Sequence, residues 1–275
     1  MDCVCANFGV YDYSPGMPLL LSHDVAGAGA PVLLLHSGVC DRRMWDPQWD
    51  ALARRFRVIR CDLRGFGDTP LPDERFSNVE DLSALLDHEG IQETAVVGSS
   101  FGGRVALGFA STYPERVTRI VLLCSALRGF PRTDDVERFA REEDELMESG
   151  RIDEAVALNV RTWLGPEADH ETRELVAHMQ RRAFEVQLAV TEDPEEDESE
   201  VDLRRLTMPA LVVSGGKDLE QFRKIAEHLD GELTDARHVH LPWAGHLPSL
   251  ERPDAVSELL LDFLAQGSTT IGPRG

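Results

Sequence analysis

The sequence predicts a single α/β domain whose mostly parallel sheet is interrupted by a helical insertion. Short, continuously apolar runs alternate with helix-length segments through residue 127 and again from residue 207, which is typical of a parallel sheet covered by helices on both faces. Between these two parts, residues 128–206 show helical periodicity and no convincing strand. The length of 275 residues fits this interpretation, since a single core can grow to about 250–300 residues before a chain splits.

The expected strands are short apolar runs bounded by glycine, proline or turn residues. They lie at residues 19–25, 32–36, 56–61, 95–98, 120–124, 210–214 and 238–241. The expected helices carry apolar residues at three- and four-residue spacing. They lie at residues 79–89, 101–113, 134–148, 153–163, 170–190, 221–229 and 255–265. We therefore assign residues 1–127 and 207–266 to the sheet core and 128–206 to a helical cap.

Two polar segments show neither pattern. Residues 192–200 are acidic, include Pro194 and have no apolar stripe, so we expect a mobile, solvated loop. Residues 267–275 are rich in glycine, serine and threonine, and we expect a flexible tail.

Composition narrows the class of protein. The formal net charge of −21 opposes binding to nucleic acid or to anionic membranes. The chain has no apolar run of about 18 residues and no signal-like start, so we expect a cytoplasmic protein, as a monomer or homodimer. The five cysteines are scattered and odd in number, which is not a disulfide framework. Cys3 and Cys5 lack a second pair at metal-ligand spacing, so no metal or other cofactor is expected.

Ser100 is the predicted nucleophile. It is central in Gly98-Ser99-Ser100-Phe101-Gly102, which follows a buried-strand run and opens a helix. That strand–turn–helix setting is the one a nucleophile elbow requires, because the small residues let strand and helix approach closely while the turn projects the hydroxyl. Ser99 is the neighbouring alternative.

His246 is the predicted base among nine histidines. It lies just after the last predicted strand, at the carboxyl edge of the sheet, where open α/β sheets gather catalytic groups. His238 and His240 lie within that strand, and we expect them to be structural, with a metal site as the alternative.

Asp218 is the predicted acid that orients the imidazole. It follows the penultimate strand through Gly215-Gly216-Lys217 and gives the chain order Ser100, Asp218, His246, which is nucleophile, acid, base. Glu220 is the runner-up.

Acyl transfer also needs donors for the developing oxyanion. The backbone N–H of Phe101, directly after the nucleophile, is one expected donor. Gly38, in the loop His36-Ser37-Gly38-Val39, is the expected second donor, and Val39 is the alternative if the loop register differs by one residue.

The chain resembles the α/β-hydrolase superfamily from Leu19 to Leu264. Four blocks in the right order carry the resemblance: His36-Ser37-Gly38 followed by Trp45, residues 62–67, the elbow at Ser100, and residues 215–218 with Gly245-His246. The resemblance implies an eight-stranded, mostly parallel sheet with a helical cap, and it is strongest toward small bacterial esterases, enol-lactonases and carbon–carbon bond hydrolases. One departure is Ser37, where members of the family often have glycine. We expect the 62–67 block to be structural.

The function expected from these residues is hydrolysis of a small, largely neutral or apolar ester or lactone through an acyl-enzyme. Alternatives are carbon–carbon bond hydrolysis, a lyase or peroxidase-like reaction on the same site, and a catalytically silent binder of small ligands. Bulky apolar side chains of the cap and the two catalytic loops are the candidate substrate contacts, with packing inside the cap as their alternative role. These candidates are Phe139, Met147, Trp163, Phe184, Val39 and Leu247.

Overall fold

The computed structural model describes residues 20–190, 194–197 and 200–266, so the two N-terminal cysteines and the expected C-terminal tail lie outside the described residues. At its centre is a seven-stranded sheet in the order β1-β3-β2-β4-β5-β6-β7, in which only β1 is antiparallel to its neighbour. The strands are β1 (His23–Ala26), β2 (Pro31–Leu35), β3 (Arg57–Cys61), β4 (Thr94–Ser99), β5 (Val117–Leu123), β6 (Ala210–Gly215) and β7 (Ala236–Leu241). The predicted mostly parallel sheet is confirmed. The described residues form seven strands, whereas the resemblance implied eight.

Nine α-helices occur in the described part of the chain. They are α1 (Asp46–Ala53), α2 (Asn78–His88), α3 (Phe101–Thr112), α4 (Asp134–Glu148), α5 (Ile152–Trp163), α6 (His170–Gln187), α7 (Glu220–Glu232), α8 (Pro248–Glu251) and α9 (Pro253–Ala265). The short helices α1 and α8 were not predicted. In α1 only Gln48 and Leu52 are buried, so the segment has too few core positions to show a helical stripe.

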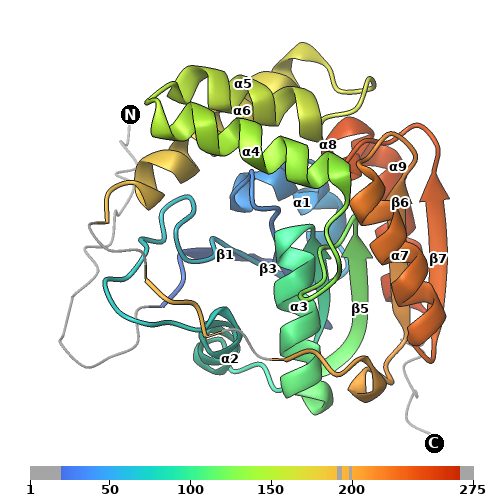
Figure 1. Cartoon of the computed structure of the whole chain (residues 1–275). Coiled ribbons are helices and arrows are strands. Elements are labelled where there is room, and N and C mark those ends of the chain that lie inside the picture. Colours follow the sequence, from blue (N-terminus) through green and yellow to red (C-terminus); the bar gives the residue numbers. More distant parts are fainter. Residues whose placement is uncertain (1–19, 191–193, 198–199, 267–275) are drawn as a thin grey trace, which may run out of the picture.

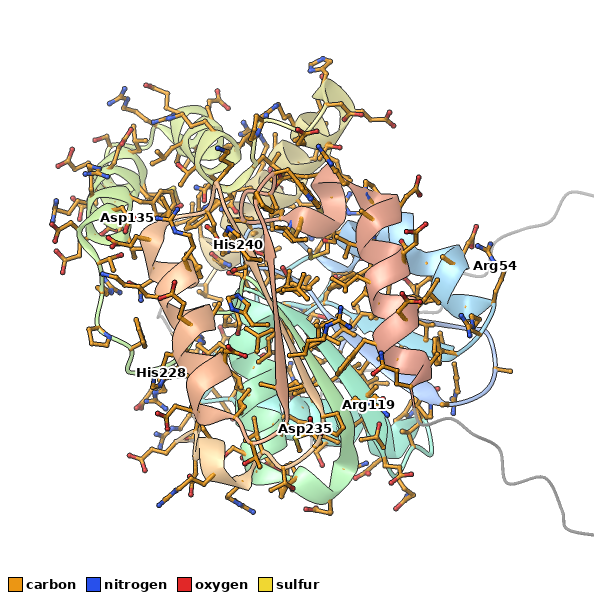
Figure 2. The ribbon with its side chains drawn as sticks, turned by 90° about the vertical axis from the view of Figure 1, so that its right-hand side faces the viewer. Arg54, Arg119, Asp135, His228, Asp235 and His240 are labelled. Atoms are coloured by element: carbon orange, nitrogen blue, oxygen red, sulfur yellow. The ribbon has the colours of Figure 1, made fainter. Side chains whose placement is uncertain are left out.

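Alternation along each strand divides the core into two layers. In β2, Leu33 and Leu35 pack with residues of α2, α3 and α7, whereas Val32 and Leu34 pack with residues of α1 and α9. Figure 2 shows α7 and α9 on opposite sides of β7. Both faces of the sheet are therefore covered, which explains why its strands are continuously apolar.

The helices α4, α5 and α6, here called the cap helices, lie between β5 and β6 in the chain and above the carboxyl ends of the strands (Figure 1). Polar contacts join them to the core. The Gln187 side-chain amide donates to the Gly65 carbonyl at 3.3 Å. The Glu220 N–H, at the start of α7, donates to the Asp135 carboxylate of α4 at 2.6 Å. No helix in the described ranges is both long and apolar enough to cross a membrane.

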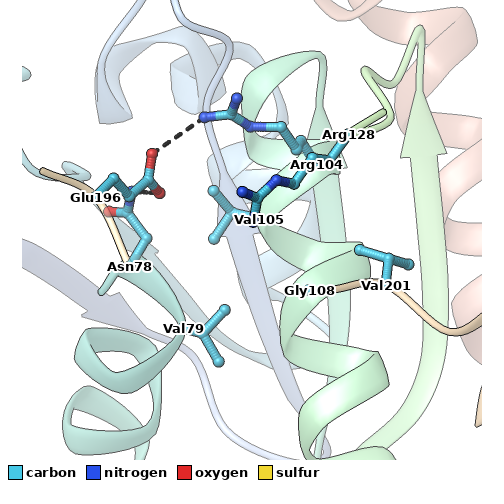
Figure 3. Close-up of a pocket in the computed structure, with 8 residues that line it drawn as sticks. All are labelled: Asn78, Val79, Arg104, Val105, Gly108, Arg128, Glu196 and Val201. Atoms are coloured by element: carbon cyan, nitrogen blue, oxygen red, sulfur yellow. Dashed lines mark hydrogen bonds and ion pairs between the residues drawn. The ribbon is translucent and has the colours of Figure 1, made fainter. Parts of the chain in front are cut away.

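The structure describes residues 194–197 of the acidic segment, and they make hydrogen bonds and ion pairs to the core. Backbone hydrogen bonds join Phe76 to Glu195 and Asp197, at 3.2 and 2.6 Å. The Glu196 carboxylate accepts from the Asn78 amide at 2.6 Å and pairs with Arg104 at 3.2 Å (Figure 3). Glu195 and Asp197 are exposed, in line with a solvated loop. Glu196 is half-buried, and sequence composition does not reveal that Arg104 and Asn78 offer partners for its charge.

Candidate active site

Ser100 occupies the strained turn between β4 and α3. Its φ of 51° and ψ of −111° place a non-glycine residue at positive φ, a conformation that persists only where the surroundings enforce it. Two backbone hydrogen bonds fix it against the β5 side: Ser100 N–H donates to the Leu123 carbonyl at 2.9 Å, and Ala126 N–H donates to the Ser100 carbonyl at 3.1 Å. This is the local geometry expected of a nucleophile elbow.

The glycines that flank the elbow are required by close approach. A Cβ on Gly98 would lie 2.4 Å from the Gly102 carbonyl oxygen, and a Cβ on Gly102 would lie 2.5 Å from the carbonyl oxygens of Leu35 and His36. Neither neighbour is a flexible side chain, so larger residues would force strand and helix apart. The sequence pattern around Ser100 therefore has the steric basis on which the prediction relied.

His246 and Asp218 are brought together by the loops that follow β7 and β6. The Nδ1 atom of His246 lies 2.8 Å from an Asp218 carboxylate oxygen, and both residues are buried. The imidazole is also enclosed by the rings of Trp163 and Phe222, with centroid distances of 4.6 and 4.1 Å. The bond to Asp218 fixes the ring orientation and leaves Nε2 as its other polar atom.

Glu251 fixes the loop that carries His246. Its two carboxylate oxygens accept from the Gly245 N–H at 3.0 and 2.9 Å. Burial raises the pKa of Glu251 above its ordinary value, although backbone N–H groups of Gly245, Gly165 and Leu247 oppose this. Because Gly165 belongs to the cap region, one buried carboxylate ties the cap to the histidine loop. Sequence reasoning did not identify this residue.

Cys124, directly after β5, places its thiol beside the Asp218–His246 pair, and the ligand atoms of the three residues lie within 4.8 Å of one another. Burial, followed by the charge of Asp218, raises the pKa of the Cys124 thiol well above its ordinary value. Metals bind the thiolate rather than the thiol. The Cys124 Sγ instead donates to the Gly245 carbonyl at 3.8 Å, so the cluster is better suited to a packed thiol than to a metal centre.

The loop after β2 lies against the elbow. Gly102 N–H donates to the His36 carbonyl at 3.0 Å, and a Cβ on Gly38 would lie 3.4 Å from the Phe101 Cβ. Ser37 is buried, and its N–H points to the Met44 sulfur at 3.2 Å. Among the described residues, the backbone N–H groups of Gly38 and Phe101 have no hydrogen-bond acceptor. The loop thus has room for Ser37 and places Gly38 next to Phe101, the residue that follows Ser100.

Ser100 and His246 open onto one cavity of about 340 Å³ between the core and the cap helices. Within the described residues the Ser100 hydroxyl makes no hydrogen bond to the imidazole, and such contacts in empty sites commonly tighten only when substrate binds. The cavity is lined from both sides. Its lining residues are Ser37, Gly38, Val39, Phe66, Ser100, Phe101, Phe139, Glu143, Asn159, Trp163, Gln180, Phe184, Gln187, Phe222 and His246.

Four of the six candidate substrate contacts, Val39, Phe139, Trp163 and Phe184, are in this lining. Met147 and Leu247 are not, which corrects the expectation for both. Met147 packs in a cluster inside the cap, and Leu247 is fully buried in the layer that contains α1 and α9. The hydrophobicity of a side chain therefore did not distinguish residues that line the cavity from residues that pack inside the protein.

Seven lining residues were not predicted as site residues, and one of them is Ser37 in the loop after β2. Phe66 comes from the block expected to be structural, and its ring lies 5.6 Å from that of Phe101. Phe222 follows the Asp218 loop. The other four are polar residues of the cap helices: Glu143, Asn159, Gln180 and Gln187.

Comparison with known proteins places the chain in a family. Residues 32–259 match the Alpha/beta hydrolase family. The chain is 28% identical over 263 residues to a 2-hydroxymuconate semialdehyde hydrolase of Pseudomonas sp. strain CF600, covering 89% of each chain. It is 28% identical over 246 residues to a pimeloyl-[acyl-carrier protein] methyl ester esterase of Neisseria meningitidis, covering 86% of this chain and 93% of that protein.

A solved structure gives the same result. A thermophilic esterase from Thermogutta terrifontis superposes with a TM-score of 0.72 at 28% identity, covering 89% of this chain and 92% of that one. The family match spans most of the chain, including the elbow and both loops that supply the buried His–Asp pair. This protein therefore belongs to the α/β-hydrolase family and is a hydrolase.

Proposed function

We propose that this hydrolase cleaves small carboxylic esters or lactones through a Ser100–His246–Asp218 triad. One observation carries the proposal: the buried His246–Asp218 pair, joined at 2.8 Å, opens onto the same cavity as a serine held at positive φ. A serine hydroxyl is a weak nucleophile on its own and needs an adjacent base that a third group orients.

In the proposed first step, His246 Nε2 takes the proton of the Ser100 hydroxyl as its oxygen attacks the substrate carbonyl. Asp218 stabilises the imidazolium that forms while remaining ionised. The tetrahedral intermediate collapses, the leaving alcohol takes the proton from His246, and an acyl ester remains on Ser100. Water, deprotonated by His246, then attacks this ester and releases the acid.

The developing oxyanion would be held by the backbone N–H groups of Gly38 and Phe101. Phe101 is the first residue of α3, where N–H groups lack helical acceptors and the helix dipole favours negative charge. Gly38 lies next to Phe101 across the elbow. Two such donors are worth several orders of magnitude in acyl transfer.

Cavity size and lining support a small substrate without negative charge. A volume of about 340 Å³ lies near the lower end of the range usual for small-molecule sites. The lining contains aromatic side chains and, among the described residues, no arginine or lysine. A carboxylate placed there would be desolvated without a cationic partner.

Carbon–carbon bond hydrolysis is the second candidate, since the chain is 28% identical to a 2-hydroxymuconate semialdehyde hydrolase over most of its length. The absence of a cationic side chain from the described lining counts against a carboxylate-bearing substrate, and it makes ester or lactone cleavage the better supported reaction.

A screen of esters, lactones and enol-type diketones of graded chain length, with product analysis, tests the proposal. We expect turnover of neutral esters or lactones, and a fall of about 10³-fold or more for Ser100→Ala. A serine-directed fluorophosphonate should label the wild-type protein at Ser100. Near-normal ester turnover by Ser100→Ala would exclude the triad, and turnover confined to diketones would favour the second candidate.

A further inference from the structure

The cap side of the cavity is unexpectedly polar. Four polar side chains from three cap helices reach it: Glu143 from α4, Asn159 from α5, and Gln180 and Gln187 from α6. The core side is apolar apart from the proposed catalytic groups and Ser37. A substrate in this cavity would therefore contact Ser100 at one side and polar cap residues at the other.

Asn159 already uses both of its amide N–H donors and one of the two lone pairs of its amide oxygen. Its amide oxygen accepts from the Trp163 indole N–H at 2.8 Å. Its amide nitrogen donates to the Ala155 carbonyl at 3.0 Å and to one Glu143 carboxylate oxygen. The network fixes the orientation of the Asn159 amide and requires that the Glu143 oxygen facing it be an acceptor.

Glu143 therefore presents a second carboxylate oxygen for which no partner is found among the described residues. Burial raises the pKa of Glu143 above its ordinary value, and the charge of Asp144 adds to this, while the Asn159 amide opposes it. Glu143 is half-buried, so its charge is partly desolvated. A hydrogen-bond donor on a bound molecule would compensate that cost.

Gln180 supplies a second, independent observation. The residue is 4% exposed, and its Oε1 atom is buried without a hydrogen-bond partner within the described residues. Since no hydrogen bond among these residues fixes its amide, the amide group can turn and present this acceptor to the cavity that Gln180 lines. An unpaired buried acceptor is unfavourable, and a donor on a bound molecule would satisfy it. Gln180 and Glu143 line the same cavity.

We propose that Glu143 and Gln180 form an acceptor subsite that binds a hydrogen-bond donor, a hydroxyl or an ammonium group, on the part of the substrate that faces the cap. This inference rests on the proposed hydrolysis at Ser100 and specifies its substrate class: small esters or lactones whose acyl part bears a donor. Glu143 and Gln180 are specificity residues and take no part in the bond-breaking steps.

Four methyl esters of matched length test the subsite. They are methyl heptanoate, methyl 6-hydroxyhexanoate, methyl 6-aminohexanoate and monomethyl heptanedioate, which end in methyl, hydroxyl, ammonium and carboxylate groups. We expect kcat/KM to be about ten-fold higher for the hydroxyl and ammonium esters than for methyl heptanoate, and lowest for the carboxylate ester. Ratios of two esters in one preparation do not depend on the folded fraction of the enzyme.

Two variants and one control assign the preference to residues. Glu143→Gln can keep the bond to Asn159 while losing the charge, so the ammonium preference should fall about ten-fold and the hydroxyl preference should fall less. Gln180→Leu should lower both preferences. Glu142→Gln is the matched control, because Glu142 is exposed on the same helix and pairs with Arg161; its ester ratios should not change.

Binding to the Ser100→Ala variant, measured by calorimetry with the same four esters, separates the two proposals. If no ester is turned over while the hydroxyl and ammonium esters bind best, the hydrolase proposal fails and the subsite stands. Equal kcat/KM and equal binding for the methyl, hydroxyl and ammonium esters would overturn the subsite. Donor preferences that survive unchanged in Glu143→Gln and Gln180→Leu would also overturn it.

Discussion

The indole of Trp163 lies against the imidazole of His246, with ring centroids 4.6 Å apart, and the Trp163 carbonyl accepts the His246 backbone N–H at 3.0 Å. Trp163 is the last residue of α5. A single cap residue thus contacts the proposed base through both its side chain and its main chain. The cap helices therefore help to position His246 as well as to cover the cavity.

Replacing Trp163 should separate these roles. Trp163→Phe keeps an aromatic ring against His246 but loses the indole N–H bond to Asn159, so we expect a fall in kcat/KM of about ten-fold or less. Trp163→Ala removes the ring and leaves a cavity beside the imidazole, with an expected loss of about 3–5 kcal/mol in the free energy of unfolding. Urea denaturation and ester kinetics on both variants provide the check. Equal effects of the two substitutions would show that the ring contact is unimportant.

Asp218→Asn should leave the fold intact and remove most of the activity. An amide at this position can stabilise the wrong tautomer of His246 and cannot stabilise its charged form, an effect worth about 10⁴-fold in serine proteases. We expect a fall in kcat of about 10³–10⁴-fold on the best ester, with little change in KM. Glu220→Gln is the matched control, because Glu220 is the sequence runner-up and lies two residues away at the start of α7. If Glu220→Gln lowered kcat more than Asp218→Asn, Glu220 would be the acid that orients His246, in place of Asp218.

The loops and turns that carry the proposed triad could be predicted because local sequence determines them. Gly98 and Gly102 are dictated by close backbone approach around Ser100, and parallel strands deliver Asp218 and His246 to one edge of the sheet. The apolar runs of the strands were equally visible, since both faces of the sheet are covered. Those features depend on neighbours along the chain or on the parallel topology.

The cap lining could not be predicted, because it depends on how three helices pack. Glu142 and Glu143 are adjacent and chemically identical, yet Glu142 pairs with Arg161 on the surface and Glu143 lines the cavity. Adjacent residues differ by about 100° around a helix, and an acidic run gives no apolar stripe from which to choose the inward position. The same limit explains Met147. It packs against the same cap cluster as Phe139, but of the two only Phe139 lines the cavity.

Glu251 should prove essential for the histidine loop. Glu251→Ala leaves the buried Gly245 N–H without its acceptor, so we expect a loss of about 2–3 kcal/mol in the free energy of unfolding, together with reduced kcat. Glu251→Gln retains one carbonyl acceptor and removes a poorly solvated charge, and we expect it to cost about 1 kcal/mol. Chemical denaturation and ester kinetics measure both effects. Glu258→Gln, at an exposed position of α9, controls for loss of surface charge.

His36 should make the fold sensitive to mild acid. It is fully buried; its Nδ1 lies 2.8 Å from the Ser37 carbonyl, and its Nε2 accepts from the Leu63 N–H at 3.0 Å. This pattern assigns the neutral tautomer with the proton on Nδ1. Burial lowers the pKa of His36 from the ordinary value of 6.5, outweighing the neighbouring charge of Asp62. Protonation of Nε2 would also place an N–H group opposite the Leu63 N–H, and the hydrogen bond between them would be lost.

The sign of the pH effect follows from this lowered pKa. Between the folded and unfolded pKa values the unfolded chain binds more protons, so the free energy of unfolding rises with pH. The contribution of His36 is complete above its unfolded pKa of about 6.5 and is lost as the pH falls toward the folded pKa, by up to about 1.4 kcal/mol per pH unit. Urea midpoints at about pH 7.5 and 5.5 should therefore differ more in the wild type than in His36→Gln, whose amide can serve both partners. A His228→Gln control, at an exposed position of α7 (Figure 2), should keep the wild-type difference, and an equal difference in His36→Gln would contradict the assignment.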